Sequence, residues 1–593
     1  MIDPVMEGTR ENPKGGKCFM SEEISGSQAI VRVLKEEGVP QIFGVHGGHI
    51  WSMLGVACEA GIRMMHMRHE QSGAYAADGW GRVSRRPGVC FGTAGPGLYN
   101  MLGALSHTAL SRSPVVAIVG QHGTTQDGWG PFQEAYGEDV CRTFTKWSKR
   151  VIDTSMVSYW MQKAFRDALA YPPGPVLVEV PVDVMGALGQ NPKKASQSGY
   201  MPKEEIVRPK PAQGDPAEVE KAVRMLLDAE KPVVVAGGGV YWADASEELK
   251  EFVELTNIPV HTRRIGRGAV PENHPLAFTG GYRRPIFSAC DAMLLVGHQL
   301  NILEGFGQPP TYGRKTKYIQ VAENEEEFSP MIPAKISIWG NPKQVLRQMM
   351  DCAKSLKKEP PKRKEWLETI SKAREAYRKQ QREEAEVVRT ARPMNPRFMA
   401  QVVVDFLDDS ATVIYDSFTF VAFVTDRIEA KFAGQILDAG TYGGVGHAIG
   451  MGIGAQLARP GKQVIGLIGD GGVGVAGFDI ETAARYKIPV VYFVFNNSGW
   501  LPNAYQKLVC PEMDPWGMLE DIRYDKIFAE MGCHTELVTE PDQIRPALER
   551  AFNSGKTSVI NAVPDKTVLA PLHESRLKVY RGEEKDRLLG GGR

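Results

Sequence analysis

Two short polar motifs follow apolar runs in the last third of the sequence, and both carry oxygen ligands. Gly469-Asp470-Gly471 comes directly after VIGLI, and Asn496-Asn497-Ser498-Gly499 comes directly after VVYFVF. If the two runs are neighbouring parallel strands, the Asp470 carboxylate and the Asn497 amide oxygen meet at the carboxyl edge of the sheet. With a nearby backbone carbonyl they suit an octahedral Mg²⁺ whose remaining positions suit a diphosphate. The alternative for either motif alone is a tight turn or an asparagine cap.

The glycines of the first motif fit the same interpretation. Gly469 and Gly471 would let the backbone approach phosphate groups and would leave N–H groups free at the start of a helix.

A third candidate for chemistry is Glu70, in the stretch RHEQSGAYAADG at residues 68–79. Small residues and an apolar helical face follow it, so the stretch predicts a helix. Taken alone, Glu70 is also consistent with a first-turn carboxylate that interacts with the helix dipole.

The elements that must position these residues are buried parallel strands. Short β-branched runs alternate with longer amphipathic stretches, which is the pattern of βαβ units. The predicted fold class is α/β, with three doubly wound parallel-sheet domains. The predicted strands are Val115–Val119, Pro175–Val180, Pro232–Gly239, Ala292–Gly297, Val464–Gly472 and Val490–Asn497. Whether the first and third domains share one architecture cannot be decided from residue identities.

Composition shifts give the domain boundaries. A Gly-, Pro-, Ser- and Lys-rich stretch and a dense run of mixed charge separate the three predicted units. The expected organisation is a disordered extension at 1–20, a first domain at 21–185, a linker at 186–212, a central Rossmann-like domain at 213–353, a charged helical linker at 354–392, a third domain at 393–565 and a tail at 566–593.

The overall composition excludes several classes of protein. The chain has 593 residues, with 70 Lys+Arg against 70 Asp+Glu, which argues against a nucleic-acid binder. No apolar run is long enough for a membrane span, and the N-terminus has no apolar signal region. The eight cysteines are scattered without metal-ligand spacing, so we expect reduced thiols and a cytoplasmic protein.

Together the motifs resemble those of the thiamine-diphosphate enzymes that include acetolactate synthases, oxalyl-CoA decarboxylases and 2-hydroxyacyl-CoA lyases. The resemblance runs from about residue 22 to residue 565. It implies that Asp470, Asn497 and the Gly499 carbonyl hold Mg²⁺ and that Glu70 activates thiamine diphosphate through N1′ of its pyrimidine.

Two further segments fit the same family. The stretch TYGGVG at residues 441–446 is similar to the segment that supports the bent cofactor, which implies that the Gly443 carbonyl accepts from the 4′-amino group and that Val445 is the apolar wedge. The stretches GTAGPG at 92–97 and FQE at 132–134 also match, and the second places Gln133 near the reacting carbons.

The segment LNILEGFGQPPTY at 300–312, followed by KYIQV, looks most like the 2-hydroxyacyl-CoA lyase branch. That branch keeps an arginine for the CoA phosphates at Arg284 or Arg283. Gln299 and Ala322 depart from the pattern, so ADP in the central domain stays an open alternative and FAD is not expected. Leu501 replaces the branch's tyrosine, which leaves its proton-handling role to other groups. The candidates are His49, His122 and Gln133.

The resemblance implies a homodimer or homotetramer, because Glu70 would reach a cofactor held by the partner's third domain. The expected activity is cleavage of a 2-hydroxyacyl-CoA to formyl-CoA and an aldehyde or ketone, or the reverse condensation. The alternatives are an acetolactate-synthase-like carboligase or 2-oxo acid decarboxylase, and a non-catalytic relative that only binds the diphosphate. The tail at 566–593 is either a frayed end or a lid over the CoA-bearing site.

Overall fold

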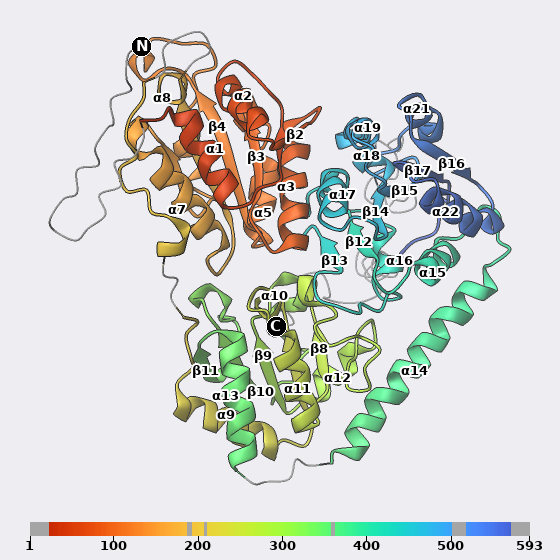
Figure 1. The fold of residues 1–593 in the computed structure, drawn as a ribbon. Coiled ribbons are helices and arrows are strands. Elements are labelled where there is room, and N and C mark those ends of the chain that lie inside the picture. Colours follow the sequence, from red (N-terminus) through yellow and green to blue (C-terminus); the bar gives the residue numbers. More distant parts are fainter. Residues whose placement is uncertain (1–22, 187–192, 207–209, 357–361, 501–516, 571–593) are drawn as a thin grey trace, which may run out of the picture.

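The computed structural model describes residues 23–186, 193–206, 210–356, 362–500 and 517–570. The expected N-terminal extension, Leu501 and most of the tail lie outside these residues. Three α/β units follow one another along the chain, and each contains one parallel sheet (Figure 1). The α/β prediction with three parallel sheets is therefore confirmed. No helix among the described residues is long and apolar enough to cross a membrane.

The first unit contains a six-stranded sheet with the order β2-β1-β3-β4-β6-β5. Its strands are β1 Gln41–Gly44, β2 Arg63–His66, β3 Gly88–Gly92, β4 Val115–Gln121, β5 Ser148–Arg150 and β6 Pro175–Pro181. Its helices are α1 Gly26–Glu36, α2 Trp51–Glu59, α3 Glu70–Ser84, α4 Pro96–Tyr99, α5 Leu102–Leu110, α6 Gly137–Cys141, α7 Val157–Leu169 and α8 Val182–Met185.

The central unit contains a five-stranded sheet with the order β11-β10-β9-β7-β8. Its strands are β7 Pro232–Ala236, β8 Val260–Thr262, β9 Ala292–Val296, β10 Lys317–Ala322 and β11 Ala334–Trp339. Its helices are α9 Pro216–Asp228, α10 Gly238–Trp242, α11 Ser246–Thr256, α12 Arg283–Ala289 and α13 Pro342–Ser355.

The third unit contains a six-stranded sheet with the order β13-β12-β14-β15-β17-β16, which is the same arrangement as in the first unit. Its strands are β12 Thr412–Tyr415, β13 Ile436–Asp438, β14 Val464–Gly469, β15 Val491–Phe495, β16 His534–Val538 and β17 Ser558–Ala562. Its helices are α15 Pro396–Phe406, α16 Val421–Val424, α17 His447–Ala458, α18 Asp470–Ala476, α19 Asp479–Arg485, α21 Tyr524–Glu530 and α22 Ile544–Asn553. The shared architecture, undecided from sequence, is thus present.

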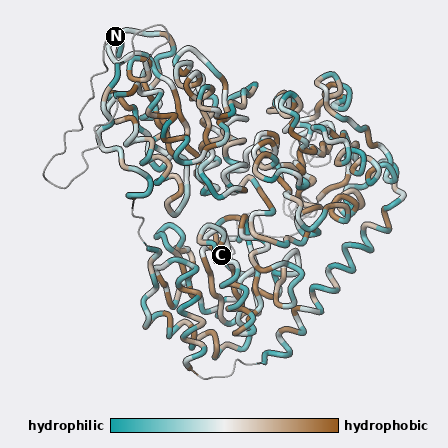
Figure 2. Tube along the Cα trace, in the orientation of Figure 1, coloured by the Kyte–Doolittle hydropathy of each residue, from teal (hydrophilic) through white to brown (hydrophobic). Residues whose placement is uncertain are grey.

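The six strands predicted from apolar runs are all present and parallel to their neighbours, with small differences at their ends. β7 ends at Ala236, β14 ends at Gly469 and β15 ends at Phe495. In the first two cases the glycines that follow belong to the turn into α10 or to the start of α18. Figure 2 shows the apolar stretches inside the sheets and the polar residues on the outer helices.

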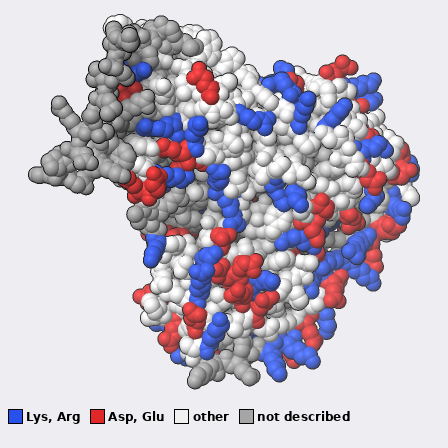
Figure 3. Space-filling view, in the orientation of Figure 1, with Lys and Arg blue, Asp and Glu red and all other residues white. Residues whose placement is uncertain are grey.

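One helix, α14 (Lys364–Val387), runs from the central unit to the third unit (Figure 1). Charged pairs four residues apart stabilise its exposed face, as between Lys364 and Glu368 and between Lys379 and Glu383. Trp366 and Ile370 are buried against the central unit. Figure 3 shows positive and negative side chains interspersed over this face of the molecule, in keeping with the balanced charge of the chain.

The first and third units share one hydrophobic core, because α3 packs directly on α17. Small residues allow the two helices to approach closely. A Cβ added to Gly79 would lie 2.3 Å from the Met451 carbonyl oxygen, and one added to Gly454 would lie 1.9 Å from that of Ala76. This contact fixes how the two similar sheets face each other.

Candidate active site

The carboxyl edge of the third sheet brings Asp470, Asn497 and Gly499 together, as predicted for a metal site. β14 and β15 pair in register with Gly469 opposite Phe495, so the two motifs leave the sheet at one edge. Asp470 Oδ2 accepts from the Gly499 N–H at 2.9 Å, and Asn497 Nδ2 donates to the Gly499 carbonyl oxygen at 3.0 Å. Gly471 N–H donates to Asp470 Oδ1 at 3.0 Å.

The chemistry of this donor set fits a hard divalent cation. Asp470 is 2% exposed, burial raises the pKa of its carboxyl to about 6, and no cationic side chain pairs with it in the described part of the chain. A metal would supply that missing positive charge. The described residues contain no group of three His, Cys, Asp or Glu side chains suited to a metal, so this site would use one carboxylate, one amide and one carbonyl.

A second buried carboxylate, Asp416, organises the adjacent loop and was not predicted. It follows β12 and accepts the N–H groups of Gly446 at 3.0 Å and Ala448 at 3.1 Å. Gly443 and Gly446 have φ values of 66° and 84°, which glycine adopts without strain. A side chain at Gly443 would meet open space, and Val445 is half-buried beside it. The strand-then-aspartate pattern VIYD was the available signal.

Glu70 lies at the carboxyl edge of the first sheet, as the first residue of α3. It is buried, and its Oε2 accepts from Asn100 Nδ2 at 2.9 Å. Asn100 was not predicted, although it follows the GTAGPG stretch that was singled out. A buried carboxylate held by an amide donor is positioned for proton transfer at a fixed point.

The residues considered for proton handling gather at the same edge of the first sheet. His49 Nδ1 lies 3.1 Å from Thr93 Oγ1, and Thr93 Oγ1 lies 3.4 Å from Gln133 Oε1. The His49 ring stacks on Phe132, with centroids 6.2 Å apart. Burial and the nearby charge of His122 lower the pKa of His49. Gln133 has a φ of 61°, an uncommon backbone conformation that concentrates at functional sites.

The two edges are not in direct contact through these residues. Among the described residues, no hydrogen bond or ion pair links Glu70 to Gly443, Asp470 or Asn497. The segment before Glu70 contacts α19, where Arg68 N–H donates to Asp479 Oδ1 at 2.8 Å. Within one chain, the predicted catalytic carboxylate and the predicted metal site therefore do not touch.

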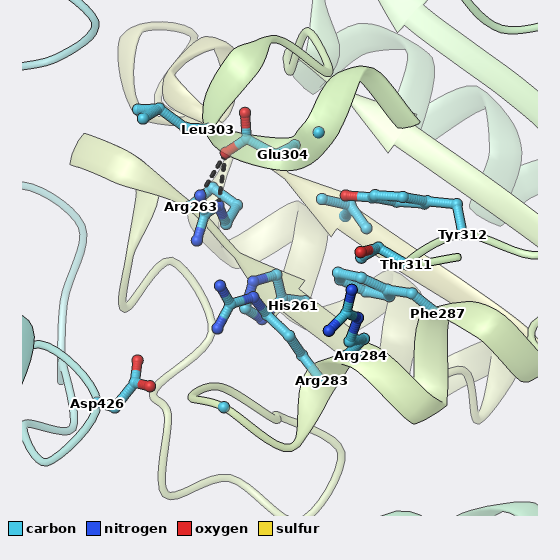
Figure 4. A pocket seen from close by; sticks show the side chains of 13 residues that line it. His261, Arg263, Arg283, Arg284, Phe287, Leu303, Glu304, Thr311, Tyr312 and Asp426 are labelled. Atoms are coloured by element: carbon cyan, nitrogen blue, oxygen red, sulfur yellow. Dashed lines mark hydrogen bonds and ion pairs between the residues drawn. The ribbon is translucent and has the colours of Figure 1, made fainter. Parts of the chain in front are cut away.

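Arg283 and Arg284 line a cavity of about 320 Å³ at the carboxyl edge of the central sheet (Figure 4). Arg283 donates to the Gly280 carbonyl oxygen at 2.8 Å, and burial and the charge of Arg263 lower its pKa. In Figure 4, Arg263 is paired with Glu304, whereas no dashed line joins Arg283 or Arg284 to a carboxylate. A ligand anion would favour the charged form of Arg283.

The sequence matches three family models in the same order as the three units. They are described as the thiamine pyrophosphate enzyme N-terminal TPP binding domain (residues 24–141), central domain (219–349) and C-terminal TPP binding domain (421–562). All three sheets fall within the span of these matches or beside it.

Full-length relatives divide between two named activities. A probable acetolactate synthase of Mycobacterium bovis is 30% identical over 557 residues, which cover 93% of this chain and 98% of the relative. The 2-hydroxyacyl-CoA lyase of Arabidopsis thaliana is 29% identical over 91% of this chain and 96% of its own. Human 2-hydroxyacyl-CoA lyase 1 is 28% identical, over 91% and 94%. These identities do not separate the two activities.

Proposed function

The chain belongs to the thiamine pyrophosphate enzymes, and from that premise we propose that it cleaves a 2-hydroxyacyl-CoA into formyl-CoA and an aldehyde or ketone. The same chemistry in reverse is an acyloin-type condensation. When bound, the cofactor supplies a carbon nucleophile and takes up the electrons of the broken bond.

Different residues of the chain would bind the metal, support the cofactor and transfer the proton. Asp470, Asn497 and the Gly499 carbonyl would hold Mg²⁺, and Gly443 and Val445 would support the cofactor beside them. The Glu70 carboxyl would hold and release a proton at its buried position. Retention of a buried carboxylate there speaks against a relative that only binds the diphosphate.

The observation that carries the choice of substrate is the arginine-lined cavity. CoA esters carry several phosphate groups that pair with guanidinium forks, and two neighbouring arginines suit such a polyanion better than the single carboxylate of a 2-oxo acid. Arg283 and Arg284 form no ion pair among the described residues, although Asp426 also lines the cavity, while Arg263 beside them is already paired with Glu304. Two unpaired arginines in one cavity favour a ligand with more than one negative charge.

The test is steady-state turnover of short, branched and long 2-hydroxyacyl-CoAs with detection of formyl-CoA. Arg284→Gln and Arg283→Gln are expected to raise KM for the CoA ester by ~10-fold or more with little change in kcat, because a charge-assisted hydrogen bond contributes about 1.5–3 kcal/mol. Arg545→Gln is the matched control, since Arg545 lies on α22, away from the cavity, where it pairs with Glu549 and covers the Phe406 ring. Lack of turnover across all chain lengths would reject the proposal. A thermal-shift comparison of CoA, ADP and FAD would identify a nucleotide that prefers the cavity.

The second candidate is an acetolactate-synthase-like carboligase or 2-oxo acid decarboxylase. The 30% identity to a probable acetolactate synthase over nearly the full length supports it. Consumption of pyruvate in the absence of any CoA ester would favour this candidate over the lyase.

Membership of this family also leads us to propose a homodimer, or a homotetramer built from such dimers, in which each site takes Glu70 from one protomer and the metal site from the other. Exposed aromatic side chains stand beside both edges, with Phe132 77% and Phe478 67% exposed. Co-expression of Glu70→Gln and Asp470→Asn chains, assayed at a Mg²⁺ concentration that saturates wild-type sites but leaves the Asp470→Asn protein inactive, tests this arrangement. Random pairing would leave one intact site in each mixed dimer and recover about a quarter of wild-type activity. No recovery would mean that both residues act within one chain.

A further inference from the structure

The loop that follows β4 contains a histidine–carboxylate pair, formed by His122 and Asp127. His122 comes directly after β4 and is 4% exposed. Its Nε2 donates to Asp127 Oδ1 at 2.6 Å, five residues further along the same loop. Two contacts to Asp183 anchor the loop, from Thr124 N–H at 3.1 Å and from Thr124 Oγ1 at 2.6 Å.

The carboxylate of this pair is itself fixed by an arginine. Arg150, the last residue of β5, donates to both Asp127 oxygens, at 2.9 and 2.7 Å. The hydrogen bond with Arg150 lowers the pKa of Asp127, so the carboxylate is ionised and can only accept. Arg150 Nη2 also lies 3.4 Å from His122 Nε2, but the shorter contact, to a carboxylate that can only accept, assigns the proton of His122 to Nε2.

The other ring nitrogen is left without a partner. His122 Nδ1 is buried and has no hydrogen bond within the described residues. The charged and titratable groups around the ring are Asp127, Arg150, Glu134, whose Oε1 lies 3.9 Å from Nε2, and His49. His49, which is close enough for the charge of His122 to lower its pKa, belongs to the Thr93–Gln133 cluster, so His122 lies near the residues expected to face the reacting carbons.

We propose that His122 Nδ1 carries the proton of the cleavage reaction, with Asp127 and Arg150 as positioning residues. This inference rests on the function proposed above. Nδ1 accepts the proton of the substrate's 2-hydroxyl group as the bond between C2 and the thioester carbon breaks and the hydroxyl oxygen becomes the carbonyl of the departing aldehyde or ketone. The electron pair of that bond stays with the thioester carbon, which then takes the same proton from Nδ1 and leaves as formyl-CoA. No net proton is gained or lost.

The experiment compares His122→Gln, Asp127→Asn and the control His274→Gln. His274 forms a comparable pair with Glu254, 3.1 Å apart, on the central unit. We expect His122→Gln to lower kcat by ~10²-fold, the range of general acid–base catalysis, while KM stays near wild type and the control keeps full kcat. Asp127→Asn should lower kcat by ~10-fold and shift the pH profile, because the amide no longer fixes an ionised acceptor.

Two readouts do not depend on turnover. Histidine ¹⁵N NMR should show the Nε2–H tautomer for His122 in the wild type and its loss in Asp127→Asn. Deuterium exchange at the reactive carbon of bound cofactor should be normal in His122→Gln and lost in Glu70→Gln. Full kcat in His122→Gln, or a wild-type Nδ1–H tautomer, would overturn the inference.

Failure of the proposed function gives a different result. If the wild type cleaves no CoA ester but consumes pyruvate, the same variants are compared on pyruvate, whose reaction also takes up a proton, on carbon when an aldehyde is released or on the new hydroxyl oxygen when a second molecule is joined. A retained loss of kcat in His122→Gln would then support the inference while the lyase assignment falls. If the wild type uses neither substrate, the two readouts that do not need turnover decide the role of His122. Normal deuterium exchange at the cofactor together with an Nδ1–H tautomer of His122 would reject the inference. An Nε2–H tautomer that is lost in Asp127→Asn would support it.

Discussion

The first and third sheets have the same strand order, yet their carboxyl edges carry different chemistry. The third edge presents backbone N–H groups, glycines and two buried carboxylates, Asp416 and Asp470, which together suit a metal and a diphosphate. The first edge presents titratable side chains, among them Glu70, His49 and His122. One strand order can therefore present either backbone groups that suit the binding of a ligand or side chains that suit the transfer of a proton.

The strongest test of these different roles is to replace one carboxylate at each edge. Glu70→Gln should lower kcat by ~10²–10⁴-fold, because a carboxamide cannot take up the proton, while cofactor affinity stays close to wild type. Asp470→Asn should instead raise the Mg²⁺ concentration needed for activity, and kcat should recover at high Mg²⁺. Titration of activity against Mg²⁺ and cofactor measures both. Intact kcat in Glu70→Gln would end the proposed division of roles.

The pH dependence of stability tests a further carboxyl group at the first edge, that of Glu179. Glu179 is 1% exposed on β6, and burial raises its pKa from 4.5 to about 7. The folded state therefore keeps a proton that the unfolded state loses, and this group's contribution to stability falls as pH rises from about 4.5 to about 7, then stays constant. The fall is about 3 kcal/mol for a shift of this size.

Glu179→Gln should remove this decline, so its free energy of unfolding should change less than that of the wild type between pH 4.5 and 7. Denaturant unfolding at a series of pH values measures it. Gln121 Nε2 would keep an acceptor in the variant, since it donates to Glu179 Oε1 at 2.8 Å in the wild type. Equal slopes for the two proteins would contradict the assignment.

The packing that joins the two sheets gives a smaller effect. Gly454→Ala would place a Cβ 1.9 Å from the Ala76 carbonyl oxygen, so α3 and α17 must separate. We expect a loss of about 1–3 kcal/mol in the free energy of unfolding. Gly55→Ala on α2 is the control, because nothing lies within 4 Å of its added Cβ, and it should stabilise by about 0.4–1 kcal/mol. Equal melting temperatures for the two variants would exclude a close helix contact.

The smallest predicted effect concerns the loop at the third edge whose backbone N–H groups donate to Asp416. In Asp416→Asn, the amide can accept through one oxygen only, so the N–H of either Gly446 or Ala448 loses its partner. Loss of one such bond costs about 1 kcal/mol, and we expect cofactor to bind ~5–10-fold more weakly. Isothermal titration with cofactor and Mg²⁺ measures this, with kcat at saturation unchanged.

The fold was largely predictable because its central strands are buried on both faces and read as unbroken β-branched runs. Strands outside the six predicted ones were missed, among them the edge strand β5 (Ser148–Arg150), which is short and polar and depends on pairing with β6. The proximity of Asp470, Asn497 and Gly499 followed from two adjacent strand ends. Asn100 and Asp127 could not be found, because their roles depend on contacts with residues distant in sequence or on the path of a loop. Asp416 was missed although it follows a strand directly, in VIYD. Glu179 left a visible signal, a lone charge inside the apolar run PVLVEV.

The seam between α3 and α17 also limits how this molecule can move or be divided. Because one apolar core runs through both, the first and third units form a single block, and we expect rearrangement during turnover in the loops or in the position of the central unit. Neither the first nor the third unit is expected to be stable as a separate polypeptide, because separating them would expose a large apolar face on each fragment.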